Sequence, residues 1–228
     1  MAALNETVRG KIVDYDEQRG ELIIRAPYQD FPTMVRREYE TVEIMLVDSR
    51  PLSSKQRRSC YAMIREIADW AGDDASEVKQ YLKTDFWASE LINTADTMFS
   101  LSNAPMSIVA AFQRWLARFI VRHDVPCKKS LLSYVDDVED YVYACIIHKK
   151  CAICGKPADL HHVDPIGMGR DRTEIIHEGL PVLPLCREHH TETHGMPTQE
   201  FLKKYHLNGG IPADKTICKL YRLKARKE

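Results

Sequence analysis

Two short cysteine-containing turns constrain this 228-residue chain more than any other feature of its sequence. The first turn is C-A-I-C at residues 151–154, and the second, C-R-E-H at residues 186–189, repeats the same two-residue gap. Thiolate and imidazole groups with this spacing can close a tetrahedral Zn²⁺ site. We therefore predict a structural zinc ion held by Cys151, Cys154, Cys186 and His189, with the residues between the two turns folded against it.

The composition is that of a soluble globular protein, with 44% hydrophobic and 29% charged residues. No apolar run reaches the roughly 18 residues of a transmembrane helix, and the N-terminal MAALNETVRGK lacks the apolar core of a signal peptide. We therefore expect a cytoplasmic protein without a membrane partner. The net charge of −1 excludes a wholly basic nucleic-acid binder but permits a local basic surface, such as the C-terminal KLYRLKARKE.

The N-terminal part predicts a sheet followed by helices. VRGKIVDYD and GELIIRAP flank the turn DEQRG, and YETVEIMLVD alternates apolar and polar residues, which together indicate a small antiparallel sheet within residues 7–48. Helices are expected at about residues 53–72, 75–86, 102–126 and 136–150. The first would begin at Ser53 or Ser54, end at Gly72, and bury one face that includes Cys60, Met63, Ile64, Ile67 and Trp70.

A change in composition at residue 151, where histidines become frequent, indicates a domain boundary near residues 148–150. The predicted fold class is therefore α+β, with one domain at residues 1–148 and a second at residues 149–228. Trp70, Trp87 and Trp115 lie on apolar helix faces, and we expect them in the core rather than stacked on nucleic-acid bases.

The remaining histidines of the second domain indicate a further site. His190 and His194 are four residues apart on a predicted helix, so both rings can reach one ion. His161 and His162 lie in a strand-like run, where adjacent side chains point to opposite faces. One of this pair can therefore face the ion while the other faces a substrate.

Residues 151–194 resemble a known family. CAICGKPADLHHVDPIGMGRDR followed by LCREHHTETH is similar to the H-N-H (ββα-metal) nucleases with an accessory zinc knuckle that bacteriophages and prophages encode. The preceding segment resembles NinB-type phage recombination accessory proteins through its order of sheet and then helices. The resemblance implies a DNA- or partner-binding domain before residue 149 and a nuclease domain after it.

The resemblance also implies roles for individual residues. His161, His190 and His194 would bind the catalytic ion, and His162 would be the general base. The family's central Asn corresponds here to Pro181, so we expect the base-carrying loop to be supported by other residues. The candidates are His177 or Glu178, either of which could instead supply a further ligand, and Asp164, which either orients a histidine or caps the turn at Pro165.

The chemistry follows from these residue types. A neutral imidazole is a suitable base near pH 7, and a divalent ion can stabilise a phosphate oxygen and the departing 3′ oxygen. Imidazole ligands favour transition metals, so we expect Mn²⁺ or Ni²⁺ to support cleavage readily and Mg²⁺ to be allowed. Arg170 and Arg172 in the loop IGMGRDR, and Arg187 in the zinc turn, are candidate DNA phosphate contacts.

Two functions remain open at this point. The first is a metal-dependent DNA endonuclease of phage recombination or replication. The second is a non-catalytic, zinc-stabilised DNA-binding protein that recruits a recombinase or a single-strand-binding protein. The concentration of histidines at residues 161–194 favours the nuclease, because a structural zinc knuckle does not need them.

Overall fold

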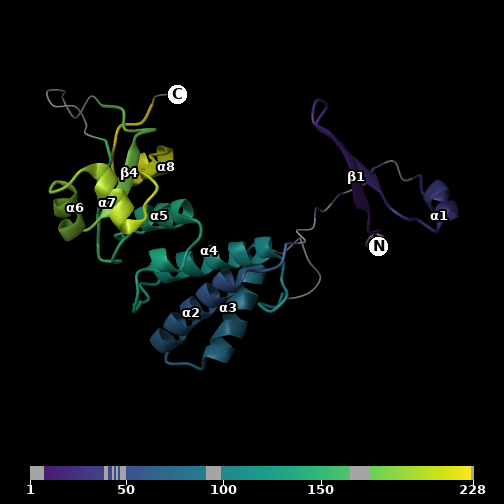
Figure 1. Ribbon diagram of the computed structural model, residues 1–228, viewed down its shortest axis with the longest axis horizontal. Coiled ribbons are helices and arrows are strands. Elements are labelled where there is room, and N and C mark those ends of the chain that lie inside the picture. The colour runs from purple at the N-terminus through teal and green to yellow at the C-terminus, as the bar shows by residue number, and fades with distance from the viewer. Residues whose placement is uncertain are drawn as a thin grey trace. The chain divides into compact units, whose positions relative to one another are not determined.

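The computed structural model of the chain describes residues 8–38, 41–42, 44, 46, 50–90, 99–164 and 175–226. These residues form an α+β structure, as predicted, in two compact units (Figure 1). Unit 1 comprises residues 1–47 and unit 2 comprises residues 48–228. The boundary that we predicted near residues 148–150 thus falls inside unit 2.

Unit 1 contains the first two predicted strands. β1 (Lys11–Asp16) and β2 (Glu21–Arg25) pair antiparallel, as expected for a hairpin. α1 (Phe31–Arg36) was not predicted; it begins where the Asp30 side chain accepts a hydrogen bond from the Thr33 N–H. The third predicted strand, at residues 39–48, is not seen at residues 41, 42, 44 and 46, and its other residues lie outside the described ones.

Unit 2 begins with the predicted helices. They are α2 (Ser54–Ala71), α3 (Ala75–Glu90), α4 (Met106–Arg122) and α5 (Val138–Ile147), with a short 3₁₀ turn at Leu131–Ser133. α2 has the predicted ends: the Ser53 side chain forms a capping box with Gln56, and Gly72 adopts a left-handed conformation. α4 starts later than predicted, at Met106, because a residue that precedes proline, here Ala104, is disfavoured in a helix.

The tryptophans depart in part from the expected core positions. Trp87 and Trp115 are partly buried and pack against the core, as predicted. Trp70 is 46% exposed, so it is not part of the buried face of α2, whereas the four other apolar residues predicted there are buried. Trp70 follows the last buried turn of α2, and its ring lies 6.5 Å from the ring of His123.

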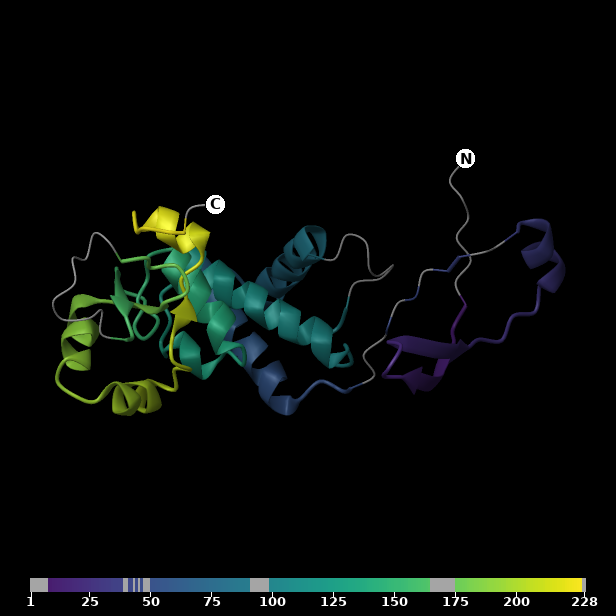
Figure 2. The same ribbon diagram turned by 90° about the horizontal axis from the view of Figure 1, so that it is seen from above.

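A small sheet and three short helices complete unit 2. β3 (Asp159–His162), β4 (Pro181–Leu185) and β5 (Ile211–Pro212) are antiparallel in the order 3-4-5. α6 (Arg187–Thr193), α7 (Thr198–Tyr205) and α8 (Lys215–Leu220) surround this sheet. Figure 2 shows α8, in yellow, on one side of the strands and α7, in yellow-green, on the other.

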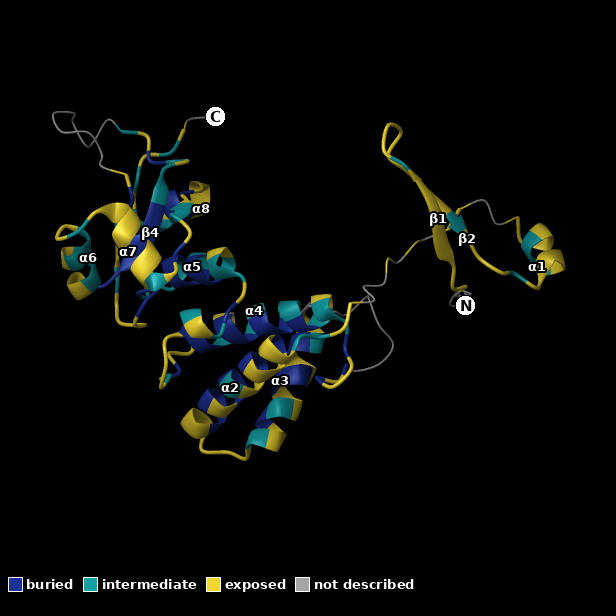
Figure 3. Ribbon diagram, viewed as in Figure 1, coloured by how far each residue is buried: buried dark blue, intermediate teal, exposed yellow. Residues whose placement is uncertain are grey.

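A single core runs through unit 2. Its buried residues extend from Cys60 on α2 to Cys218 on α8, and α5 contacts β4, β5 and α8. Figure 3 shows the buried residues following α4, α5 and β4. Because α5 packs against elements that follow residue 150, the chain does not divide into compact units at residues 148–150. No helix in the described part of the chain is both long and apolar enough to span a membrane.

Candidate metal centres

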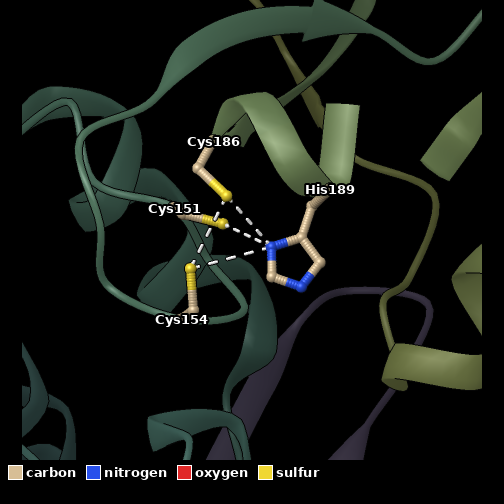
Figure 4. A group of neighbouring side chains, drawn as sticks. All are labelled: Cys151, Cys154, Cys186 and His189. Carbon is tan, nitrogen blue, oxygen red and sulfur yellow. Dashed lines mark hydrogen bonds between the residues drawn. The ribbon is translucent and has the colours of Figure 1, made fainter. Parts of the chain in front are cut away.

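The first candidate centre joins the two turns that contain the cysteines. The first turn follows α5 and is closed by two backbone hydrogen bonds, from the Gly155 N–H to the Cys151 carbonyl (2.9 Å) and from the Cys151 N–H to the Lys156 carbonyl (2.8 Å). Gly155 has a φ of 72°, which favours glycine. Cys186 is the N-cap of α6, and His189 lies in the first turn of that helix. Figure 4 shows the four side chains pointing toward one another.

The distances within this cluster fit one tetrahedral ion. His189 Nδ1 lies 3.2 Å from Cys186 Sγ, 3.5 Å from Cys151 Sγ and 3.7 Å from Cys154 Sγ. Cys154 Sγ and Cys186 Sγ are 3.7 Å apart. A zinc ion at ordinary bond lengths separates its sulfur and nitrogen ligands by about 3.5–3.8 Å. Three of these distances lie in that range, and the distance from His189 Nδ1 to Cys186 Sγ is shorter. The Cys₃His cluster therefore has the donors and the dimensions of a zinc site.

The thiols of the first centre differ in their electrostatics. Burial raises the pKa of Cys154 to about 12. Burial favours the neutral thiol of Cys186, but the backbone N–H groups of His189 and Glu188 and the neighbouring thiols lower its pKa overall. Burial lowers the pKa of His189, which keeps its ring neutral near pH 7. A thiolate and a neutral imidazole are the forms that bind metal.

The second candidate centre consists of three imidazoles on β3 and α6. The ring centroid of His161, on β3, lies 4.8 Å from that of His190 and 5.9 Å from that of His194, and the two latter rings are 5.0 Å apart. One donor nitrogen from each residue lies within 4.8 Å of the others. The pairing of β3 with β4, which leads directly into α6, brings these residues together across 33 positions of sequence.

Two of the three rings, His161 and His190, are favoured in the neutral form that binds a metal. Burial lowers the pKa of His161 to about 4, and the charges of His190, His194 and His162 act in the same direction. Burial, followed by the effect of His194, lowers the pKa of His190. Lone pairs on these nitrogens are therefore available to an ion at neutral pH.

His162 lies on the other face of β3 and contacts His177. Its Nε2 atom is 2.9 Å from His177 Nδ1, and the two rings are 4.9 Å apart. Burial, followed by the charge of His177, lowers the pKa of His162. The adjacent histidines of β3 thus have different neighbours, as the alternation of a strand predicts.

The other supporting residues lie in several places. Pro181 begins β4, and its carbonyl accepts a hydrogen bond (2.9 Å) from the N–H of Val163, the residue after His162. A main-chain carbonyl can make this contact without an Asn side chain. Asp164 is exposed, and Glu178 accepts a hydrogen bond (2.8 Å) from the Arg226 N–H. Among the described residues, neither carboxylate belongs to a cluster of candidate metal ligands.

The predicted arginines divide into two cases. Arg187 is exposed at the start of α6, within the same helix as His190. Arg187 precedes His190 by three residues on α6, so the two side chains lie on the same side of that helix. Arg170 and Arg172 lie outside the described residues.

One contact at the zinc cluster was missed by sequence reasoning. The ring of Tyr205, on α7, packs edge-on against the ring of His189 at 5.3 Å, and the Tyr205 hydroxyl donates to Glu192 (2.8 Å). These contacts restrict the orientation of the His189 ring. The sequence does not predict this contact, because a single Tyr on an amphipathic helix belongs to no metal-binding motif.

A family model described as "Putative HNHc nuclease" matches residues 32–224. The chain belongs to this family. The HNHc nuclease match covers both candidate metal centres and nearly all of unit 2, so it agrees with the H-N-H resemblance of residues 151–194 and extends well beyond them. No curated protein and no solved structure matches the chain.

Proposed function

We propose that this HNHc nuclease is a metal-dependent DNA endonuclease that hydrolyses phosphodiester bonds. One observation carries the proposal: His161, His190 and His194 converge on one side of β3, while His162 lies on the other side against His177. A purely structural zinc protein has no need of the second imidazole cluster.

The residues of the second centre fit a divalent transition metal. Three imidazoles supply borderline-soft ligands, and three protein ligands leave coordination positions for phosphate and water. When bound, the ion would offset negative charge on a phosphate oxygen and on the departing 3′ oxygen. The chain itself supplies the ligands and the proton acceptor.

His162 acts as the general base in this proposal. In the tautomer with the proton on Nε2, that N–H donates to His177 Nδ1 and the lone pair on His162 Nδ1 is free. His162 Nδ1 takes a proton from water as the water oxygen attacks phosphorus. The bond from phosphorus to the 3′ oxygen breaks, and the leaving oxygen takes a proton from solvent.

The first centre has a structural role in the same proposal. Four protein ligands would complete the coordination of Zn²⁺ and leave no position for substrate. Because His189 and His190 are neighbours on α6, a zinc ion on His189 would hold the helix that presents His190 to His161. The zinc site would thus fix the geometry of the catalytic site.

The proposed partner is DNA, with Arg187 as a phosphate contact from the described residues. A place in phage recombination or replication, with a recombinase or single-strand-binding protein as partner of residues 1–148, is supported by the resemblance of the N-terminal part to NinB-type proteins.

Cleavage assays with matched variants test the proposal. Plasmid and single-stranded DNA are incubated with the protein and Mn²⁺, Ni²⁺ or Mg²⁺, with and without chelator. We expect metal-dependent cleavage by the native protein and a loss of about 100-fold or more for His162→Ala, because general-base catalysis contributes about that much. DNA binding and zinc content should be unchanged.

His123→Ala is the matched control, since His123 is exposed at the end of α4 and contacts neither metal centre. Equal cleavage by His162→Ala and the native protein would show that His162 is not the base. DNA binding without cleavage under every ion would favour the non-catalytic alternative.

A further inference from the structure

The last described residues of the chain form an extended segment against the core. We define the C-terminal strap as residues Leu223–Arg226. Leu223 and Ala225 pack against the core, whereas Lys224 and Arg226 are exposed. The segment is anchored by the Leu223 N–H, which donates to the Cys218 carbonyl (2.8 Å), and by the preceding Tyr221, whose hydroxyl donates to the Ile146 carbonyl on α5 (2.9 Å).

The backbone of this strap holds the segment that carries His177. The His177 N–H donates to the Lys224 carbonyl (2.9 Å), and the Arg226 N–H donates to the Glu178 carboxylate (2.8 Å). Both bonds use main-chain atoms of the strap. They therefore do not depend on the positive charges of Lys224 and Arg226.

Within residues 177–180, the strap binds His177, the residue that contacts His162. Downstream, the Gly179 N–H donates to the Ala213 carbonyl (2.8 Å) and the Leu180 N–H to the His177 carbonyl (3.0 Å), which fixes the end that leads into β4. The bond to Lys224 instead fixes His177 itself, whose side chain is buried and whose Nδ1 lies 2.9 Å from His162 Nε2.

We propose that the C-terminal strap positions His177, and through it the general base His162. This inference rests on the proposed nuclease function. His177, Glu178 and the strap are positioning elements, because their contacts end at His162 and not at the substrate. The basic side chains of the strap play no part in this role.

The expected effect follows from the geometry of proton transfer. The contact with His177 restricts the rotation of the His162 ring. In the tautomer that we propose, His162 Nε2 carries the proton and donates to His177 Nδ1, which leaves His162 Nδ1 free for water. A displacement of about 1 Å at a reacting group can cost on the order of 100-fold in rate. Loosening one anchor of the strap should cause a smaller loss that falls on kcat.

A pair of substitutions at one position separates the backbone from the side chain. Arg226→Pro removes the N–H that donates to Glu178, whereas Arg226→Gln removes the charge and keeps that N–H. We expect Arg226→Pro to lower kcat roughly tenfold with KM and zinc content unchanged, and the Gln variant to retain the native kcat. Equal kcat in the Pro variant and the native protein overturns the proposal. So does an equal loss in both variants with a raised KM, which would indicate a DNA contact.

A second pair tests the other partner of the same bond. Glu178→Ala removes the acceptor, and Glu178→Gln keeps an oxygen that can accept from the Arg226 N–H. The Ala variant should lose kcat as Arg226→Pro does, and the Gln variant should restore most of it. Native kcat in the Ala variant contradicts the proposal.

A spectroscopic measurement on the full chain is independent of cleavage. NMR of ¹⁵N-labelled histidine side chains reports which ring nitrogen of His162 carries the proton. We expect one tautomer, with the proton on Nε2, in the native protein and a mixture of tautomers in Arg226→Pro. Identical spectra for the two proteins overturn the role of the strap. Native protein that shows the single tautomer but does not cut DNA overturns only the proposed nuclease function.

Discussion

At the scale of single residues, the neighbours of each imidazole decide what that imidazole can do. His189 lies among three thiols, and His161 lies beside two further imidazoles. His162 instead contacts His177. Because adjacent residues of a strand or helix point in different directions, the pairs His161–His162 and His189–His190 each divide between two sites. Two centres are thus built from one short stretch of sequence.

Arg187 provides a test at this scale. Arg187 is exposed and lies three residues before His190 on α6, on the side of the helix where a phosphate beside the scissile bond would be bound in our proposal. Arg187→Gln should weaken DNA binding and reduce the slope of log K against log salt concentration by about one, as expected for the loss of one phosphate contact.

The control for this variant is Arg65→Gln, since Arg65 is exposed on α2, a helix of the other end of unit 2 (Figure 1). Binding is measured as a salt titration with duplex DNA and Ca²⁺ in place of the catalytic ion. Parallel salt slopes for Arg187→Gln and the native protein would remove Arg187 from the DNA interface.

At the scale of elements, the loop before β5 packs closely against β4 and against the residue that follows β3. Gly210 has a φ of 87°, and a Cβ atom there would lie 2.8 Å from Val163 Cγ2 and 2.9 Å from the Val182 carbonyl oxygen. Val163 directly follows His162. A side chain at position 210 would therefore press on the strand that carries the proposed base.

A matched pair of glycines measures this constraint. Gly209→Ala introduces a side chain at a φ of 92° into open space, whereas Gly210→Ala adds a steric clash to the same kind of backbone strain. We expect Gly209→Ala to cost about 1 kcal/mol and Gly210→Ala to cost about 1–3 kcal/mol more, as overpacking does. Thermal unfolding checks both values, and equal melting temperatures for the two variants would contradict the close approach.

At the scale of the whole molecule, one core supports both the helices and the metal centres. α5 packs on β4 and α8, and the first cysteine turn follows α5 directly, so the Cys₃His cluster connects the helical part of unit 2 to α6. Unit 1 is a separate compact unit. Loss of a metal at this cluster should therefore affect the sheet and α6 before it affects α2 and α4.

Metal removal tests this arrangement. We expect about one tightly held zinc ion per chain in freshly purified protein, since such sites contribute on the order of 10 kcal/mol to folding. Chelation, or Cys151→Ser, should abolish protection of β3 and α6 from hydrogen exchange while α2 and α4 keep theirs. Cys127→Ser, outside the cluster, should retain the zinc. Metal analysis that finds no zinc would remove the structural centre.

The sequence by itself determined the features that depend on local spacing. A two-residue gap in a turn, a four-residue gap on a helix and adjacent positions in a strand each fix where side chains point, because backbone geometry repeats regularly. The pairing of Cys151 with Cys154, the pairing of Cys186 with His189, the approach of His190 to His194 and the separation of His161 from His162 each depend on such spacing. Both ends of α2 could be predicted as well, since Ser53 and Gly72 satisfy its terminal backbone groups locally.

Only the tertiary structure decided the contacts between segments that are distant in the sequence. The contact of His177 with His162, the hydrogen bond from His177 to the strap and the packing of Tyr205 on His189 depend on how β3, β4 and α5–α8 pack around one core. In the same packing, one core contains residues on both sides of residues 148–150, and Trp70 stays exposed. Such contacts have no fixed spacing, because they result from the burial of apolar surface by the whole unit, and no local pattern encodes them.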